Sequence, residues 1–352
     1  MNSGLTAMAG AIRVGQHMAD RIARAHPEAD EMTSSQGSDS GPTPAPPGRM
    51  SEAEFQRLYD RLRAQPPWGP ADRRGALNYL TPATMLAAAG EVKLGRSVSF
   101  GGPVEYGVTA DNPEPARHMM TQTGDTAPAG GLSFAMDRIG MNIHGNADTH
   151  IDALSHVIYD GRLYNNRPAD IVSDTGAAEL SIAAAADGIA GRGVLLDVPR
   201  VRGVPWLEPG DHVSAEDLAA AERDQQVKLG QGDLVFIRVG HRLRRFQLGP
   251  WDAADARAGL HPAVMEYLAD RKIALLGSDG NNDTAPSVVP GVDFPVHVLA
   301  IAALGVHLID YLDFAVLAPL CAEFRQWSFL CVIAPLRLAV ATGSPVNPIA
   351  IL

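Results

Sequence analysis

The chain has 352 residues, of which 46% are hydrophobic and 20% charged, proportions that are ordinary for a globular protein of one or two domains. Its formal net charge of -11 argues against nucleic acid or an anionic membrane surface as a partner, and no run of 18 apolar residues predicts a membrane span. The two cysteines do not suggest a disulfide framework and fit a reducing cytoplasm.

Residues 1–49 differ in composition from the rest of the chain. Their second part, over 34–47, is rich in Ser, Gly and Pro, which is typical of disordered linkers. Their first part lacks the continuous apolar core of a secretory signal. We therefore predict a disordered tail over 1–49 and one folded domain over 50–352.

The first half of the folded part carries few regular elements. A capping box and an apolar stripe predict a helix over 51–63, and a Thr-Pro pair begins a second helix at 81. A short strand is expected over 97–100. Residues 101–131 are rich in Gly, Pro and polar groups and predict a long loop, which could form a lid or stay disordered. The pattern over 132–143 is extended.

The second half alternates strands and helices, which predicts an α/β fold with a layered mixed sheet and flanking helices. Asp160-Gly161 is a tight hairpin signal. The expected strands cover 193–198, 234–239, 273–276 and 327–338, and the expected helices cover 214–225, 261–271 and 295–304.

The stretch 144–156 is the main candidate for a metal or catalytic site, because three of the 11 histidines and two aspartates fall within it. Imidazole and carboxylate together suit a zinc-like or manganese-like ion. His150 and Asp152 are two residues apart, so on an extended backbone they point to the same face. Asn146 and His156 lie four residues outside that pair on either side, where a bend could turn them inward. The alternative is a hydrogen-bonded loop without a metal.

The stretch resembles the signature of the cyclase family, which includes bacterial kynurenine formamidase, isatin hydrolase and trans-dienelactone hydrolase. That signature is His-x-Gly-Thr-His-x-Asp-x-Pro-x-His, and this chain matches it at Thr149, His150, Asp152 and His156. The resemblance implies that His150 and Asp152 hold a metal and that His156 assists catalysis. Asn146 stands where the family has its first metal-binding His.

An amide oxygen is a weaker zinc ligand than an imidazole, so Asn146 leaves two alternatives open. In one, Asn146 is the third ligand. In the other, His144 has become the ligand through a shifted backbone; otherwise we expect His144 to contact the substrate.

The resemblance extends to a distal pair. Ile309-Asp310-Tyr311-Leu312 is similar to a family segment that carries an acidic residue after a distal His. This similarity implies catalytic roles for His297 and Asp310. The alternative from the residues alone is that His297 is a core or capping residue and that Asp310 caps a helix.

Three further residues are candidate substrate contacts, each with a structural alternative. Trp68 could line a pocket or act as a core or interface anchor. Tyr164 follows the predicted hairpin and could simply belong to a turn. His241 ends a strand, a common place for functional groups, although a lone His is usually exposed.

The family resemblance covers about 51–352 and implies a swivelling β/β/α-type catalytic domain over 50–352. It implies a metal-dependent hydrolase of a small cyclic amide, lactone or N-acyl compound, with Zn²⁺ or Mn²⁺ and a small-molecule substrate. It also implies a homo-oligomer, a dimer or tetramer, for which Trp68 and region 51–80 are the candidate contacts. The alternatives are a metal-independent lyase, dehydratase or cyclase on the same fold, and a ligand-binding protein with a vestigial site.

Overall fold

The computed structural model describes residues 48–126 and 130–352, so nearly all of the tail predicted over 1–49 lies outside the described residues. The body is built on a nine-stranded sheet with the order β1-β17-β15-β9-β11-β13-β14-β4-β16. The central strands β9, β11, β13 and β14 are parallel neighbours, and the outer strands pair antiparallel. In sheet order the strands are Ser97–Ser99, Ile349–Ile351, Ser328–Ile333, Ile189–Asp197, Leu234–Arg238, Leu275–Ser278, His307–Asp310, His150–Asp152 and Gly343–Pro345.

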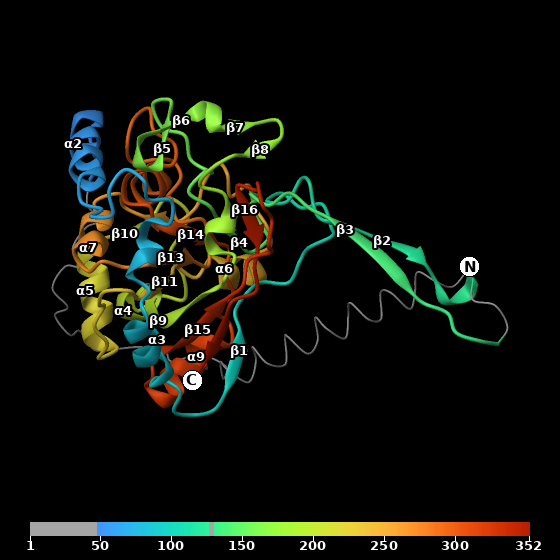
Figure 1. The fold of residues 1–352 in the computed structure, drawn as a ribbon. Helices are drawn as coiled ribbons and strands as arrows, with labels where there is room; N and C mark the ends of the chain where they lie inside the picture. The colour runs from blue at the N-terminus through green and yellow to red at the C-terminus, as the bar shows by residue number, and fades with distance from the viewer. Residues whose placement is uncertain (1–47, 127–129) are drawn as a thin grey trace.

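Helices cover both faces of this sheet (Figure 1). Successive residues of a strand point to opposite faces, so Val194 and Leu196 of β9 join one apolar core and Leu195 joins the other. The first core includes residues of α2, α5 and α7, and the second includes residues of α9. The helices are α2 Glu52–Arg63, α3 Pro82–Ala89, α4 Val198–Arg202, α5 Ala215–Asp224, α6 His241–Leu248, α7 Val264–Asp270, α8 Pro295–His297 and α9 Leu317–Phe324; a π-helix, Val298–Leu304, continues α8. The predicted layered α/β fold with a mixed sheet is confirmed.

Short elements connect these layers. One-turn 3₁₀ helices occur at Gly75–Tyr79, Gly124–Thr126, Tyr164–Asn166, Ala169–Ile171 and Ile182–Ala185. Small two-stranded sheets pair β5 (Arg162–Leu163) with β6 (Arg167–Pro168), β7 (Val172–Ser173) with β8 (Gly176–Ala177), and β10 (His212–Val213) with β12 (Gly259–Leu260).

Local sequence signals account for several of these elements. The capping box at the start of α2 is present, with Ser51 and Glu54 bonded to each other's backbone N–H. The helix buries the predicted apolar stripe against the rest of the chain. At the predicted tight turn, Asp160 and Gly161 both adopt positive φ, as a type I′ hairpin requires, and Tyr159 and Arg162 exchange backbone hydrogen bonds.

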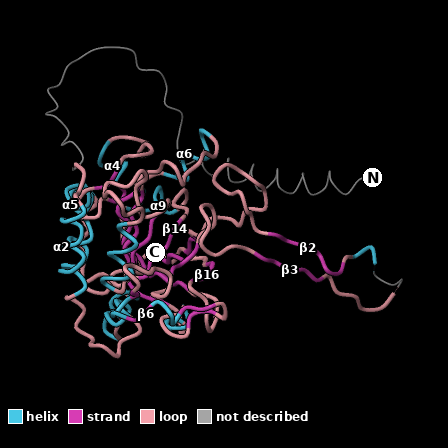
Figure 2. The backbone as a smooth tube through the Cα atoms, turned by 90° about the horizontal axis from the view of Figure 1, so that it is seen from above, coloured by secondary structure: helices cyan, strands magenta, loops and turns pink. Residues whose placement is uncertain are grey.

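The prediction of a continuous loop over 101–131 is wrong. Part of it forms strand β2 (Arg117–Gln122), which pairs antiparallel with β3 (Met136–Gly140). The two strands form an arm that projects from the body beside β16 (Figures 1 and 2). The composition signal failed because the pairing partner lies beyond the Gly-rich segment, and cross-strand pairing decides strand formation.

Within 48–126 and 130–352, every helix is too short or too polar for a membrane span.

Candidate metal and catalytic site

Strand β4 places the central candidate residues. It lies between β14 and β16, with His150 opposite Asp310 and with Asp152 opposite Gly343. Directly opposed residues of an antiparallel pair share a face, and so do residues two apart on one strand. The sheet therefore brings His150, Asp152 and Asp310 together at one point, although Asp310 lies far away in the sequence.

Asp152 is fully buried at the centre of a His/Asp cluster. The other members of this cluster are His144, His150, His156, His297 and Asp310. Its Oδ1 accepts a hydrogen bond from Nδ1 of His144 at 2.8 Å and lies 3.6 Å from Nε2 of His150. Its Oδ2 lies 3.4 Å from Nε2 of His297, yet no hydrogen bond of good geometry reaches that oxygen from the described residues. Burial raises the pKa of Asp152, but His156, His144 and His297 outweigh burial and hold the pKa well below its usual range. The carboxylate is therefore charged at neutral pH.

His297 stands at the end of α8, where three carboxylates surround its ring. Its Nδ1 donates to Oδ2 of Asp283 at 2.5 Å, and its Nε2 lies 3.4 Å from Asp152 and 3.5 Å from Asp310. Burial lowers the pKa of His297, but Asp310, Asp152 and Asp283 together raise it well above the ordinary value. His297 is thus an imidazolium held between anions.

Asp310 has its own support from the segment after β13. Its Oδ2 accepts a hydrogen bond from the side-chain amide of Asn281, and its Oδ1 accepts bonds from the backbone N–H and side-chain amide of Asn282. Burial raises the pKa of Asp310, whereas the neighbouring His297 lowers it, and the net shift is downward. The second carboxylate of the cluster is therefore also charged.

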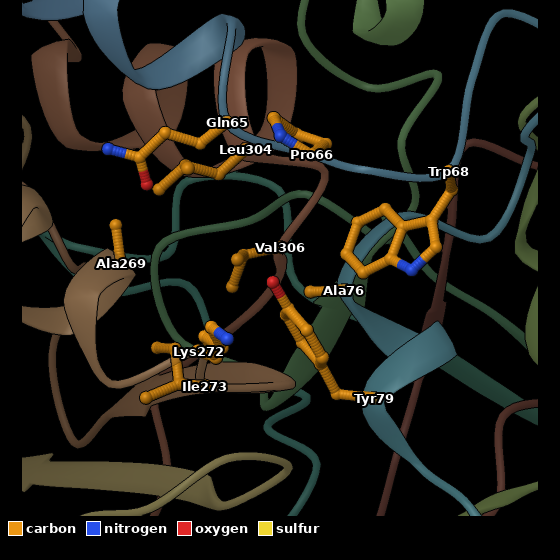
Figure 3. A pocket seen from close by; sticks show the side chains of 10 residues that line it. All are labelled: Gln65, Pro66, Trp68, Ala76, Tyr79, Ala269, Lys272, Ile273, Leu304 and Val306. Atoms are coloured by element: carbon orange, nitrogen blue, oxygen red, sulfur yellow. The ribbon is translucent and has the colours of Figure 1, made fainter.

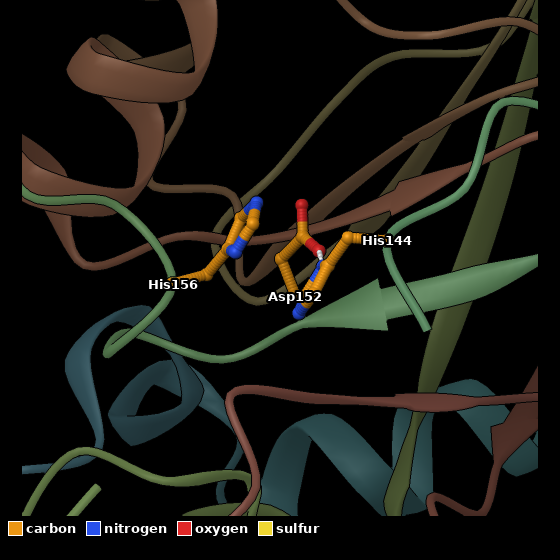
Figure 4. A group of neighbouring side chains, drawn as sticks. All are labelled: His144, Asp152 and His156. Carbon is orange, nitrogen blue, oxygen red and sulfur yellow. Dashed lines mark hydrogen bonds and ion pairs between the residues drawn. The ribbon is translucent and has the colours of Figure 1, made fainter. Parts of the chain in front are cut away.

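His156 approaches from a turn after β4, in which its N–H donates to the carbonyl of Ala153. Its ring stacks on that of His144, with centroids 3.7 Å apart and planes 7° apart (Figure 4). Burial lowers the pKa of His156 to about 4, although Asp152 acts in the opposite direction. The imidazole is therefore neutral at pH 7 and able to accept a proton.

Asn146 points to a different partner. Its Oδ1 accepts a hydrogen bond from the hydroxyl of Tyr311 at 3.2 Å. His144, two residues earlier, reaches Asp152 and also lies 2.9 Å, through Nε2, from the hydroxyl of Thr342. The geometry thus places an imidazole of His144, rather than the amide of Asn146, against the central carboxylate.

Further hydrogen bonds hold the backbone that carries these residues. The guanidinium of Arg242, which is largely buried, donates to the carbonyls of Ala147 and Tyr311. Thr149 donates its hydroxyl to the same Tyr311 carbonyl and accepts the N–H of Gly102. These contacts hold the turn before β4 in one position relative to β14.

The other predicted substrate contacts have partners outside the His/Asp cluster. Trp68 packs edge-on against Tyr79 and lines a small pocket that contains none of the cluster residues (Figure 3). Tyr164 donates its hydroxyl hydrogen to Asp72 at 2.9 Å. His241 is buried rather than exposed, with its ring 4.7 Å from that of Trp251 and 5.6 Å from that of Tyr311. Their roles as substrate contacts stay predictions.

Sequence reasoning missed the polar run Asn281-Asn282-Asp283, which supports both His297 and Asp310. The run begins three residues after the last residue of β13, in the connection at the carboxyl end of a buried parallel strand. Such positions often carry functional groups in open α/β sheets, and that signal could have identified it.

The donor set fits a divalent ion. Two groups of side chains have ligand atoms within 4.8 Å of one another, one made of His144, Asp152 and His156 and the other of His150, Asp152 and Asp310. Imidazole nitrogens and carboxylate oxygens are the ligands that zinc and manganese accept. Oδ2 of Asp152 is buried and receives no hydrogen bond from the residues that the structure describes, an arrangement that is costly unless a further partner binds there. Asp152, which belongs to both groups, is the expected centre of the metal site.

Comparison with solved structures supports the fold. A crystal structure described as a novel cyclase is 31% identical, covers 84% of this chain and 99% of its own, and superposes with a TM-score of 0.75. Isatin hydrolase A from Labrenzia aggregata, bound to benzyl benzoate, is 21% identical, covers 77% of this chain and 98% of its own, and has a TM-score of 0.52. Isatin hydrolase A from Ralstonia solanacearum is 18% identical, with coverages of 77% and 97% and a TM-score of 0.51. The likeness to the two isatin hydrolases is one of fold alone.

No curated protein matches this chain at significant similarity. The family model described as "Putative cyclase" matches residues 66–282, which is more than half of the chain and includes β4 and the first two residues of the polar run, Asn281 and Asn282. Together with the 31% identical cyclase structure, this match shows that the chain belongs to the cyclase family.

Proposed function

We propose that this chain is a metal-dependent hydrolase of a small cyclic amide, lactone or N-acyl compound. The observation that carries the proposal is the charged, buried Asp152, which has three histidines around it and one oxygen that no described residue hydrogen-bonds. Membership of the cyclase family supports it. The isatin hydrolases give a precedent for hydrolysis on this fold.

His144, His150 and Asp152 would hold the ion, with one imidazole taken from each of the two groups and Asp152 as the ligand that both groups share. His144 would then replace the ligand that the family has at the position of Asn146. A bound zinc or manganese ion would polarise the substrate carbonyl and lower the pKa of water toward neutrality.

His156 is proposed as the general base and acid. Its ring is neutral at pH 7, lies against the cluster and is only partly buried, so it can accept a proton from the attacking water. It would then donate that proton to the leaving nitrogen or oxygen of the substrate.

His297 and Asp310 are proposed to orient the substrate or relay protons. The imidazolium of His297 keeps a proton on Nε2 that faces Asp152 and Asp310. The two asparagines hold Asp310, so its carboxylate cannot rotate away without breaking three hydrogen bonds.

The test uses the full chain, freed of metal with a chelator and then reloaded with zinc or manganese. We expect about one ion per chain and hydrolysis of at least one member of a panel of cyclic amides, lactones and N-acyl amines. Asp152→Asn should lose both metal and turnover, whereas the exposed Asp170→Asn serves as the matched control. Full turnover by metal-free protein would contradict the metal mechanism.

One observation favours a second candidate, a metal-independent lyase, dehydratase or cyclase. His297 already places a positive charge between Asp152 and Asp310 from within the chain, so acid–base work by His156 could proceed without a metal. Turnover in ¹⁸O-labelled water separates the two, because only a hydrolase incorporates the label into the cleaved product. Binding without turnover would support the ligand-binding alternative.

A further inference from the structure

A pocket lies at the amino ends of β13 and β14, whereas Asp310 of the His/Asp cluster lies at the carboxyl end of β14. Its lining comes from the end of α2, the segment around Trp68, the 3₁₀ helix Gly75–Tyr79 and the end of α7. It encloses about 300 Å³ of space, part of it open to solvent. Ligand pockets begin at about this size, so the pocket has room for a molecule with a single ring.

The floor and two walls of the pocket are apolar or aromatic. Ala76, Leu304 and Val306 are buried and form the floor. Trp68 and Tyr79 form the walls, with ring centroids 4.8 Å apart and planes inclined by 68° (Figure 3). Two rings at a steep angle offer a face contact and an edge contact at once, which suits a flat apolar body.

Two polar groups reach into the same space. Figure 3 shows the hydroxyl of Tyr79 and the amine of Lys272 pointing into the pocket. Neither group forms a hydrogen bond or ion pair with the residues that the structure describes. Burial raises the pKa of Tyr79, so its hydroxyl keeps its proton at neutral pH and can donate it in a hydrogen bond. A charged donor and a neutral donor side by side match the oxygens of a carboxylate.

The backbone of Lys272 is held in a conformation that disfavours most side chains. Its φ is 54°, in the left-handed region, one residue after the C-cap of α7. Glycine is the usual residue at this position of a helix end, because a Cβ is crowded there. The Lys272 N–H donates to Ala269, and its carbonyl accepts the N–H of Gly232, so the position is fixed from both sides. A side chain kept in such a conformation indicates a use for it.

We propose that this pocket is a second ligand site, separate from the His/Asp cluster, for a small carboxylic acid with a flat apolar body. Lys272 and Tyr79 bind the carboxylate, and the rings of Trp68 and Tyr79 hold the apolar body. No acidic side chain is among the described residues that line the pocket, so a cationic ligand has no partner there. Binding at this site requires neither a metal nor turnover.

The pocket touches the two elements that carry His297 and Asp310, at their other ends. Leu304 ends the π-helix that continues α8 after His297. Val306 lies four residues before Asp310, about 13 Å along an extended backbone. A single-ring acid cannot span that distance, so it does not compete directly with a ligand at the cluster.

The first test titrates the full chain with benzoate and follows methyl signals by NMR. The signals of Ile273, Leu304 and Val306, which line the pocket, should shift saturably. Benzamide has the same shape without the charge and should bind at least about tenfold more weakly, since a hydrogen bond to a charged group contributes more than a neutral one. The absence of saturable shifts up to about 10 mM benzoate, or equal affinity for benzamide, would overturn the proposal.

The second test assigns the site with variants that keep the size of the side chain. Lys272→Met should weaken benzoate binding by about tenfold or more, and Tyr79→Phe by about 2–10-fold. Lys228→Met removes the same charge at another exposed position outside the pocket and should keep wild-type affinity. Circular dichroism should be unchanged in all three variants.

Asp152→Asn separates this pocket from the cluster and should leave benzoate binding unchanged. Loss of binding in Asp152→Asn with none in Lys272→Met would place benzoate at the cluster and overturn the proposal. Equal losses in Lys272→Met and Lys228→Met would overturn it as well, since the charge would then act from anywhere on the surface. These measurements need no turnover, so their failure leaves the proposed hydrolase standing, and the failure of the hydrolase leaves them valid.

Discussion

Nδ1 of His297 donates a hydrogen bond to Asp283 at 2.5 Å, and this bond fixes which ring nitrogen faces the cluster. Asp283 is itself held by the backbone N–H groups of Val296 and His297 at the start of α8. A buried carboxylate at Nδ1 therefore orients the ring so that Nε2 faces Asp152 and Asp310. Supporting carboxylates of this kind set the tautomer and the direction of a functional histidine.

Asp283→Asn should lower turnover or metal affinity by about 10–100-fold, the usual effect of losing such a supporting group. An amide keeps the shape of the side chain but cannot accept hydrogen bonds at both terminal atoms. Nitrogen chemical shifts of His297, followed against pH, should show a lower pKa in the variant, because one of its three carboxylate neighbours is lost. Asp293→Asn, at an exposed position in the same connection, is the control; equal effects in both variants would contradict the positioning role.

His144→Ala should weaken zinc binding by at least about 100-fold if His144 is a ligand, since even supporting groups are worth about 10–100-fold. Asn146→Ala should change zinc affinity by less than about tenfold, because the amide is bonded to Tyr311 instead. Competition with a chromophoric chelator measures both. Strong loss of zinc binding in Asn146→Ala with little loss in His144→Ala would show instead that Asn146, at the family's ligand position, holds the ion. Asn146→His should tighten zinc binding only if Asn146, rather than His144, is the ligand.

The sequence predicted the parts of the fold that local chemistry decides. The helix from Ser51, the turn at Asp160-Gly161 and the shared face of His150 and Asp152 depend on neighbours within a few residues. The pairing of β2 with β3 and the approach of Asp283 to His297 depend on contacts between segments that are distant or interrupted. No spacing rule specifies which strands become neighbours, so these features required the structure.

Arg242→Met should destabilise the fold by about 1–3 kcal/mol, because it leaves a buried backbone carbonyl of the turn before β4 without its donor. The Tyr311 carbonyl keeps the hydrogen bond from Thr149, so the carbonyl that loses its donor is that of Ala147. Urea unfolding measures the change. Arg61→Met is the control, since both partners of the Arg61–Glu266 pair are about half exposed and such pairs contribute about 1 kcal/mol or less. A larger loss in the control would refute the role of Arg242 as a clamp.

Acid should destabilise the protein through His241, which is buried and has no hydrogen bond at Nε2 within 48–126 and 130–352. Burial first, and then Arg242, Arg245 and Arg257, lower its pKa to about 3 against the opposite effect of Asp111. In the unfolded chain a histidine titrates near its ordinary pKa of about 6.5. Between these two values the unfolded state binds a proton that the folded state does not, so stability falls as pH falls below about 6.5. One such group contributes a slope of up to about 1.4 kcal/mol per pH unit.

His241→Gln should therefore lose less stability than the wild type between pH 7 and pH 5, whatever its stability at pH 7. Urea unfolding at several pH values measures both slopes, and parallel curves for the two proteins would show that His241 titrates freely in the folded state.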